Sequence, residues 1–265
     1  MFFETIGYQA TAAATTGSAA TAFSGDSLNV KNGMPNSAIR LAAIWSKNQT
    51  LGAQQIVAPS FSDTTRGIRW VAPAATLAYP FRAPMVQSLT AQELISATIV
   101  GTAVAGDIEQ GLLTLLYDDL PGQSGKYITP EDVMSQGVRS VTVQASITLT
   151  AAGGWTGAEL ITVDSDLLRA NTPYALLGGA VGIQVSAIGV RAPDWSNGRV
   201  AFPGDPANPE TTNNWFSLLS KVMGVPMIPT FNSANKNNIF LDGADDENGG
   251  ATTLQLNLVE LPPGT

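Results

Sequence analysis

Carboxylates are the only conventional catalytic or metal-binding side chains in this sequence, because it contains no histidine and no cysteine. The absence of histidine removes the commonest general base and the commonest zinc ligand. The absence of cysteine removes thiolate sites and disulfides. A Ser-His-Asp triad cannot form within this chain. Any chemistry that the chain performs by itself would therefore depend on aspartate and glutamate oxygens.

One acidic cluster has ligand chemistry that would suit calcium. It lies in a segment that also contains Gly and Asn, and it consists of Asp242, Asp245, Asp246 and Glu247. Calcium prefers oxygen ligands from loops of this kind, although the EF-hand spacing with its terminal Glu is not met. We favour a solvated acidic turn and keep calcium as the alternative. No other cofactor is expected.

Two carboxylate pairs could in principle hydrolyse glycosides, which needs two acidic groups that face each other. Asp118 and Asp119 are adjacent, and Asp164 and Asp166 lie two apart on an extended segment. Neither spacing is specific, and solvated turns explain both pairs. We therefore expect that the chain is not an enzyme.

The charge of the chain argues against direct binding of nucleic acid. It has 13 Lys and Arg residues against 21 Asp and Glu residues, which gives a net charge of −8. Nucleic-acid binding depends on neutralisation of phosphates by Lys and Arg. The basic residues here are scattered, and no basic run or arm is present.

The pattern of apolar residues predicts an all-β protein with a few short helices. From Val141 to Thr150, apolar and polar residues alternate strictly, which is typical of a strand with one buried face. Leu254–Val259 alternates in the same way. Gly (26) and Pro (16) are plentiful and charged residues make up only 13%, which favours short strands joined by many turns.

Two short helices are expected. Thr129-Pro-Glu-Asp132 carries the signature of a helix start, with Gly137 as its stop. Asn213–Met223 has apolar residues at the spacing of a buried stripe and ends at Gly224 and Pro226. The adjacent aromatics Trp215 and Phe216 make this stripe wide, so we predict that they contribute to a subunit interface, with Trp215 shared between the interface and the core.

The chain is predicted to divide into two halves. Residues 1–27 are expected to form an N-terminal arm, because residues 5–27 are rich in Thr, Ala, Ser and Gly. Residues 28–120 form a first β domain, 121–137 a linker with a short helix, and 138–265 a second β domain. Loosely similar layouts in the halves support a duplication. In the first half the layout comprises residues 38–45 and 67–70, and in the second half it comprises residues 181–190 and 199–202.

No signal peptide is expected, because the first residues lack a positive region followed by an apolar core. Two apolar stretches, 94–116 and 174–190, are interpreted as buried strands. The first contains Asp107 and Glu109, and the second contains four glycines. A membrane-spanning helix needs about 20 predominantly apolar residues.

The second half contains the segments on which a family resemblance rests. They are Leu168-Arg-Ala-Asn-Thr-Pro-Tyr-Ala-Leu-Leu-Gly178, Val190–Arg199, Phe202-Pro-Gly204, Trp215-Phe216 and Ile228–Lys236. In strands, polar loops and a late helix, this resembles the coat proteins of small icosahedral phages. In size and two-fold layout, the whole chain is similar to the double jelly-roll major capsid proteins of tailless, membrane-containing phages.

That resemblance implies two eight-stranded jelly rolls, each an antiparallel β-sandwich, with strands normal to a shell. It implies a homo-oligomer, a pseudo-hexagonal trimer, that assembles into the shell with other capsid proteins. An internal membrane would face the shell's inner surface. The expected location is the virion, after synthesis in the host cytoplasm. The alternatives are a carbohydrate-binding β-sandwich module or spike and, third, a carboxylate-based glycosidase.

Overall fold

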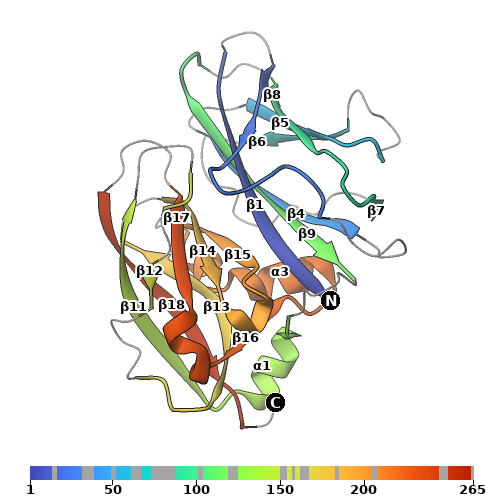
Figure 1. Cartoon of the computed structure of the whole chain (residues 1–265). Helices are drawn as coiled ribbons and strands as arrows, with labels where there is room; N and C mark the ends of the chain where they lie inside the picture. Colours follow the sequence, from blue (N-terminus) through green and yellow to red (C-terminus); the bar gives the residue numbers. More distant parts are fainter. Residues whose placement is uncertain are drawn as a thin grey trace. The chain divides into compact units, whose positions relative to one another are not determined.

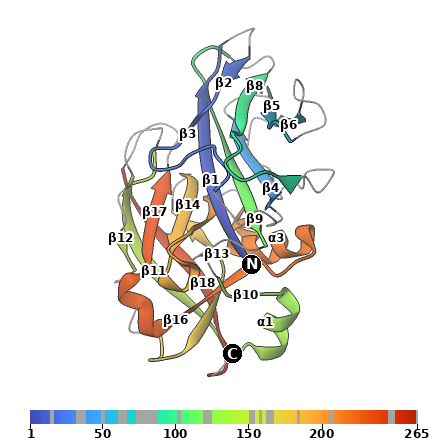
Figure 2. The same ribbon diagram turned by 45° about the vertical axis from the view of Figure 1, so that its right-hand side comes forward.

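The structure is a computed structural model of the whole chain, shown in two views in Figures 1 and 2. It describes residues 1–13, 17–31, 39–48, 52–60, 67–72, 88–100, 104–118, 125–149, 154–156, 159–161, 167–182, 185–204, 208–244 and 250–263. Within 39–48, and at Ala72 and Val100, it describes the backbone alone.

The chain forms two compact units, and both are built from antiparallel sheets. The first unit comprises Met1–Pro121 and Ala151–Gly154. Its strands are β1 (Phe2–Thr11), β2 (Ser18–Ala19), β3 (Thr21–Ala22), β4 (Ile39–Asn48), β5 (Gly52–Val57), β6 (Ile68–Ala72), β7 (Ser88–Leu89), β8 (Ser96–Val100) and β9 (Ile108–Tyr117). The predicted predominance of β structure is confirmed.

The second unit comprises Gly122–Thr150 and Trp155–Thr265. Its strands are β10 (Tyr127–Ile128), β11 (Arg139–Leu149), β12 (Glu159–Leu160), β13 (Pro173–Val181), β14 (Val185–Arg191), β15 (Arg199–Gly204), β16 (Ile228–Asn232), β17 (Phe240–Ala244) and β18 (Gly250–Glu260). Its helices are α1 (Pro130–Gln136), α2 (Pro209–Asn213), α3 (Trp215–Met223) and the 3-10 helices η2 (Pro193–Trp195) and η3 (Ser233–Asn238).

The two units have the same strand order. In the first unit the sheets run β3-β1-β9-β4-β7 and β2-β8-β5-β6. In the second they run β10-β16-β13-β18-β11 and β12-β17-β14-β15. If the short edge strands β3 and β10 are set aside, eight strands remain in each unit. Numbered along the chain, they form one sheet of order 1-8-3-6 and one of order 2-7-4-5 in both units.

The units also agree in register. The first and eighth strands pair along their whole length in each unit, from Phe2↔Tyr117 onward and from Arg139↔Glu260 onward. The third strand has a β-bulge against the eighth at the same distance along the ladder, between Leu41 and Ala43 and between Leu176 and Gly178. Matching strand order and matching bulges place Phe2 and Arg139 at equivalent positions.

The core of each unit lies between its two sheets. In the first unit the core side of β1 and β9 includes Phe2, Ile6, Tyr8, Leu113 and Leu115. In the second unit, β11 alternates as the sequence predicts, because its odd-numbered residues from Val141 to Leu149 are buried and its even-numbered residues are exposed. Alternation of this kind is the mark of a sheet with one covered face.

Both predicted helices are present in the second unit. Thr129 caps α1, since its side chain accepts from the Asp132 amide while the Asp132 carboxylate accepts from the Thr129 amide. The predicted helix at Asn213–Met223 is found as α3, which begins at Trp215 and ends at Gly224 in the left-handed conformation, while the short helix α2 precedes it and ends at Asn213. No helix among the described residues has the length and apolarity needed to cross a membrane.

The predicted N-terminal arm is wrong. Phe2–Thr11 forms strand β1, which lies between β9 and β3 and is buried over most of its length. The sequence shows no alternation here because both faces of β1 are covered. The segment 121–137 is also more than a linker, because Tyr127 and Ile128 pair with β16 as an edge strand.

The sequence predicts two pairs of corresponding segments in the two halves, and only one of these pairs corresponds in the structure. Residues 67–70 and 199–202 lie in β6 and β15, which occupy the same position in the two strand orders. Residues 38–45 and 181–190 do not correspond, because the described part of the first stretch, 39–45, lies in β4, whereas residues 185–190 of the second lie in β14, the next strand along in its unit.

Candidate functional site

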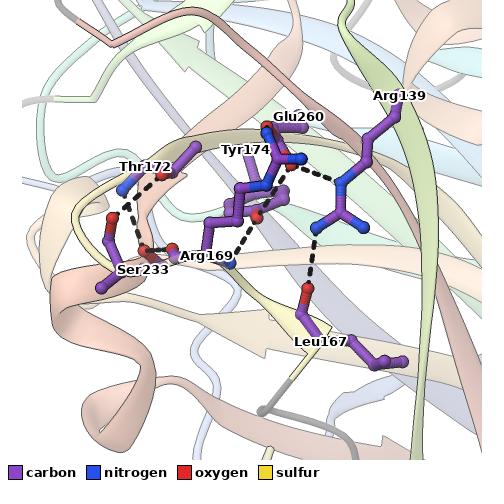
Figure 3. Close-up of polar contacts among 8 residues, drawn as sticks. Arg139, Leu167, Arg169, Thr172, Tyr174, Ser233 and Glu260 are labelled. Atoms are coloured by element: carbon purple, nitrogen blue, oxygen red, sulfur yellow. Dashed lines mark hydrogen bonds and ion pairs between the residues drawn. The ribbon is translucent and has the colours of Figure 1, made fainter.

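A dense polar cluster in the second unit is centred on the carboxylate of Glu260, at the end of β18 (Figure 3). Glu260 is 3% exposed. Arg139 donates from Nε to Oε2 at 2.6 Å, and Arg169 donates from Nη1 to Oε1 at 2.8 Å. The Tyr174 hydroxyl lies 3.4 Å from Oε2 and itself accepts from the Arg169 amide. One buried carboxylate thus holds two guanidinium groups and a phenol.

This cluster fixes the segment that leads into β13. Arg139 donates from Nη2 to the carbonyl of Leu167 at 2.9 Å. Ser233, at the start of η3, donates from Oγ to the carbonyl of Arg169 at 2.6 Å and accepts from the amide of Thr172 at 3.0 Å. Figure 3 shows these contacts gathered around one turn of the chain. The network therefore ties residues 167–172 to the ends of β11, β16 and β18.

The electrostatics of the cluster favour the ionised form of the Glu260 carboxylate. The hydrogen bond from Arg139 lowers the pKa of Glu260, and the charges of Arg169 and Arg139 act in the same direction. The same contact raises the pKa of Arg139. A carboxylate that is saturated by donors and held ionised is poorly suited to act as a general acid or base. The geometry is that of a structural clamp.

The first unit has a related cluster at the same end of its sheet. The carboxylate of Glu4, in β1, is paired with Lys31 and accepts from the Tyr117 hydroxyl at 3.1 Å. The Tyr117 hydroxyl also accepts from the amide of Lys31. Burial raises the pKa of Tyr117, with the Glu4 charge acting in the same direction, so the phenol stays protonated and donates. Lys31, like Arg169, lies in the segment before the third strand of its unit.

The predicted calcium residue Asp242 lies in β17 and is fully buried. Arg191 of β14 and Arg199 of β15 are cross-strand neighbours, and the Asp242 carboxylate contacts both of them at 2.9 to 3.1 Å. The Arg199 guanidinium also stacks 4.4 Å from the ring centre of Trp155. Asp242 therefore neutralises two cations that face each other, and its oxygens already have partners.

The rest of the predicted calcium cluster, Asp245, Asp246 and Glu247, lies outside the described residues. So do Asp119, Asp164 and Asp166 of the carboxylate pairs. Within the described ranges, no group of three or more acidic residues could hold a metal ion. The calcium interpretation thus loses Asp242 as an available ligand and otherwise stays a prediction.

Trp215 and Phe216, predicted to lie at an interface, are buried by the chain itself at 2% and 0% exposed. Phe216 meets Phe202 of β15 edge-on, at 6.1 Å between ring centres. Helix α3 packs against β13, β15 and β16. The wide apolar stripe receives its second cover from within the chain, so both residues are core residues in this structure. The Trp215 ring is buried, so its exposure does not support the predicted role at an interface.

The sequence did not identify the Glu260 cluster. Its members are separated by up to 121 positions, and each has an ordinary local context. One signal was available, since Arg139 and Glu260 lie at opposite ends of the two most regular alternating strands. Pairing those strands antiparallel from Val141 opposite Leu258 brings the two charges together.

No protein-family model matches the sequence, and no curated protein matches it. Among solved structures, the chain aligns with the PBSX exported protein XepA at 10% identity and a TM-score of 0.29, over 97% of this chain and 86% of that one. It aligns with AerE from Microcystis aeruginosa at 8% identity and a TM-score of 0.19, over 98% and 99%.

The STIV major capsid protein aligns at 9% identity and a TM-score of 0.19, over 99% of this chain and 97% of that chain. These are loose likenesses among β-rich proteins, one of them a phage protein and one a viral capsid protein. At such low TM-scores they carry no weight for function.

Proposed function

We propose that this chain is a structural virion protein, a major capsid protein built from two jelly-roll domains. The observation that carries the proposal is the strand order, 1-8-3-6 and 2-7-4-5, present twice in one chain. Eight antiparallel strands in two sheets, linked by long crossings between the sheets, are the topology of a jelly roll, a fold used by capsid proteins, lectins and cupins. Two such units in succession favour the capsid among these.

Composition and charge agree with this proposal. With no histidine, no cysteine and saturated carboxylates at Glu260 and Asp242, the described residues offer little conventional catalytic chemistry. We therefore propose a non-enzymatic role without a required cofactor. The net charge of −8 argues for a shell that does not bind nucleic acid directly, and an internal membrane is the proposed partner on the inner side.

The proposed assembly is a trimer that joins other trimers and further capsid proteins into an icosahedral shell in the virion. Three chains with two similar domains each would give six similar building blocks around one axis. Equivalent registers in the two units support this arrangement, because similar units can make similar lateral contacts.

A carbohydrate-binding module is the alternative from another class. Sugar-binding sites commonly present an exposed aromatic face on which a ring can stack. The tryptophans whose side chains are described, Trp70, Trp155, Trp195 and Trp215, are all buried, with exposures of 9% or less. The described tryptophans thus give this alternative little support.

The test is the mass of the purified protein over a range of concentrations. Native mass spectrometry and analytical ultracentrifugation should find a species of three 27.6 kDa chains at micromolar concentration. Electron microscopy of concentrated samples should show larger assemblies. A chain that stays monomeric at every concentration would contradict the capsid proposal, and specific glycan binding detected by tryptophan fluorescence would support the alternative.

A further inference from the structure

An open pocket in the first unit lies where the chain leaves β5 and where it turns after β7. Its volume is about 420 Å³, and its lining residues are Pro59, Ser60, Thr90, Ala91, Gln92 and Glu93. The Glu93 amide donates to the Thr90 carbonyl at 3.2 Å, which closes residues 90–93 into a tight turn. The Gln92 amide donates to the Val30 carbonyl at 3.0 Å, and the Val30 amide donates to the Glu93 carbonyl at 2.9 Å. One wall of the pocket is therefore an anchored turn.

The Glu93 carboxylate belongs to this lining, although only 7% of the residue is exposed. Its Oε1 accepts from the Ser60 amide. Its Oε2 accepts from the Ser60 hydroxyl at 2.6 Å and from the Thr90 amide at 2.7 Å. All of these donors are neutral. Since a carboxylate can accept about four hydrogen bonds, the Glu93 carboxylate is held firmly in place and Oε1 can still accept from a ligand.

Glu93 differs from Glu4, Asp242 and Glu260 in the charge of its partners. Each of those three buried carboxylates contacts a Lys or Arg side chain. Among the residues that the structure describes, no Lys or Arg forms an ion pair with Glu93, whose carboxylate partners are those of Ser60 and Thr90 alone. Burying a charge is unfavourable unless an opposite charge accompanies it. The pocket thus offers a buried anionic group to a cation from outside the chain.

The other lining groups fit an alkylammonium ion. The Ser60 and Thr90 hydroxyl oxygens lie 3.0 Å apart beside the carboxylate, and hydroxyl oxygens accept as well as donate. An ammonium group has three donors and no acceptor, which matches these two oxygens and Oε1 of Glu93. Pro59 and Ala91 provide apolar surface for the methylene chain of such a cation. A divalent metal ion is usually held by several carboxylate oxygens, whereas the residues that line this pocket include one carboxylate.

We propose that this pocket binds a small primary alkylammonium ion. Glu93 supplies the opposite charge, and the hydroxyl oxygens of Ser60 and Thr90 accept its remaining hydrogen bonds. This ligand site goes beyond the proposed capsid role and does not depend on it, because all of its residues lie in the first unit.

The direct test is calorimetric titration of the full chain with n-butylammonium chloride, with n-butanol as an uncharged probe of the same length. We expect one ammonium ion to bind per chain and n-butanol not to bind. Glu93→Gln should weaken ammonium binding at least about tenfold, because it removes the opposite charge. Glu131→Gln removes a carboxylate from the first turn of α1 and is the matched control, which should bind as tightly as wild type.

A second variant leaves the carboxylate and its charge in place. Thr90→Val removes one acceptor, while the backbone amide of residue 90 still donates to Glu93. It should weaken ammonium binding by roughly threefold to tenfold, and Thr90→Ser should bind as wild type does. This variant decides the question if circular dichroism shows that Glu93→Gln does not fold.

Three results would overturn the proposed site. They are equal ammonium binding by wild type and a folded Glu93→Gln, binding of n-butanol as tight as that of n-butylammonium, and no ammonium binding by wild type. Tighter binding of calcium, with displacement of the ammonium ion, would replace the alkylammonium assignment with a metal site. The capsid proposal is tested separately by the mass of the assembled protein.

Discussion

The two units share one strand order and one register, yet they treat their first strand differently. In the first unit β1 is buried on both faces, with Gly7 at its centre and the Phe23 ring where a side chain at Gly7 would lie. In the second unit, Gln144 occupies the equivalent position on β11 and is exposed. Strand order is therefore decided by the residues on the core side, and the outer side can change its chemistry without changing the topology.

The carboxylate clusters show the same separation of fold from chemistry. Both units bind the segment before their third strand through a buried glutamate, a tyrosine and a basic residue. Glu4 does this with Lys31 and Tyr117, whereas Glu260 does it with two arginines and Tyr174. The glutamate belongs to the first strand in one unit and to the eighth in the other. The segment before the third strand is thus anchored in both units, although the anchoring glutamates lie at different positions in the paired strands.

The largest expected effect is a loss of stability in the second unit, from a substitution in a part of its core that has no counterpart in the first unit. Trp195 is fully buried, donates from Nε1 to the Thr230 carbonyl at 2.8 Å and meets Phe231 edge-on. We predict that Trp195→Ala destabilises the second unit by about 3–5 kcal/mol. Hydrogen exchange read by mass spectrometry should show the loss in β13 and β16. Trp195→Phe, which keeps a ring, is the control, and an equal loss from both variants would count against ring packing as the cause.

An intermediate effect is expected when the equivalent central residues are exchanged. Gly7→Gln forces a side chain onto Phe23, where a Cβ would lie 2.0 Å from the ring, and overpacking of this kind costs about 1–3 kcal/mol or more. Gln144→Gly removes an exposed side chain and increases the backbone freedom that is lost on folding. We expect it to destabilise the protein by only roughly 0.5–1 kcal/mol. Thermal denaturation of both variants measures the asymmetry, and equal losses would show that the two strands are not covered as differently as described.

The smallest expected effect is a change in pH dependence. Because the pKa of Glu260 is held below its ordinary value of 4.5, its contribution to stability is complete above that pH. This contribution to stability is lost as the pH falls through the lowered pKa of the folded state, because the Glu260 carboxylate is protonated at a higher pH in the unfolded state than in the folded state. Glu260→Gln should therefore be less stable than wild type at pH 7, and the gap should narrow below pH 4.5. Denaturant melts from pH 7 to pH 3 measure this gap, and a constant gap would place the loss elsewhere.

Local patterns in the sequence determined a substantial part of this fold. The alternation from Val141 to Leu149, the capping residues at Thr129 and Asp132, and the stripe of α3 each depend on neighbours within a few positions. Those signals exist because one face of each element meets the core and the other meets water. Where both faces of a strand are covered, as in β1, the alternation disappears. The sequence therefore predicts an arm where the structure has a strand.

Only the tertiary structure decided which distant residues meet. The pairing of Arg139 with Glu260 joins positions 121 apart, and the ion pairs of Asp242 need three strands to come together. Nothing local distinguishes a glutamate that will be buried between two arginines from one that will be solvated. The burial of Trp215 within the chain was likewise decided by packing, because a wide apolar stripe requires a cover but does not say which surface provides it.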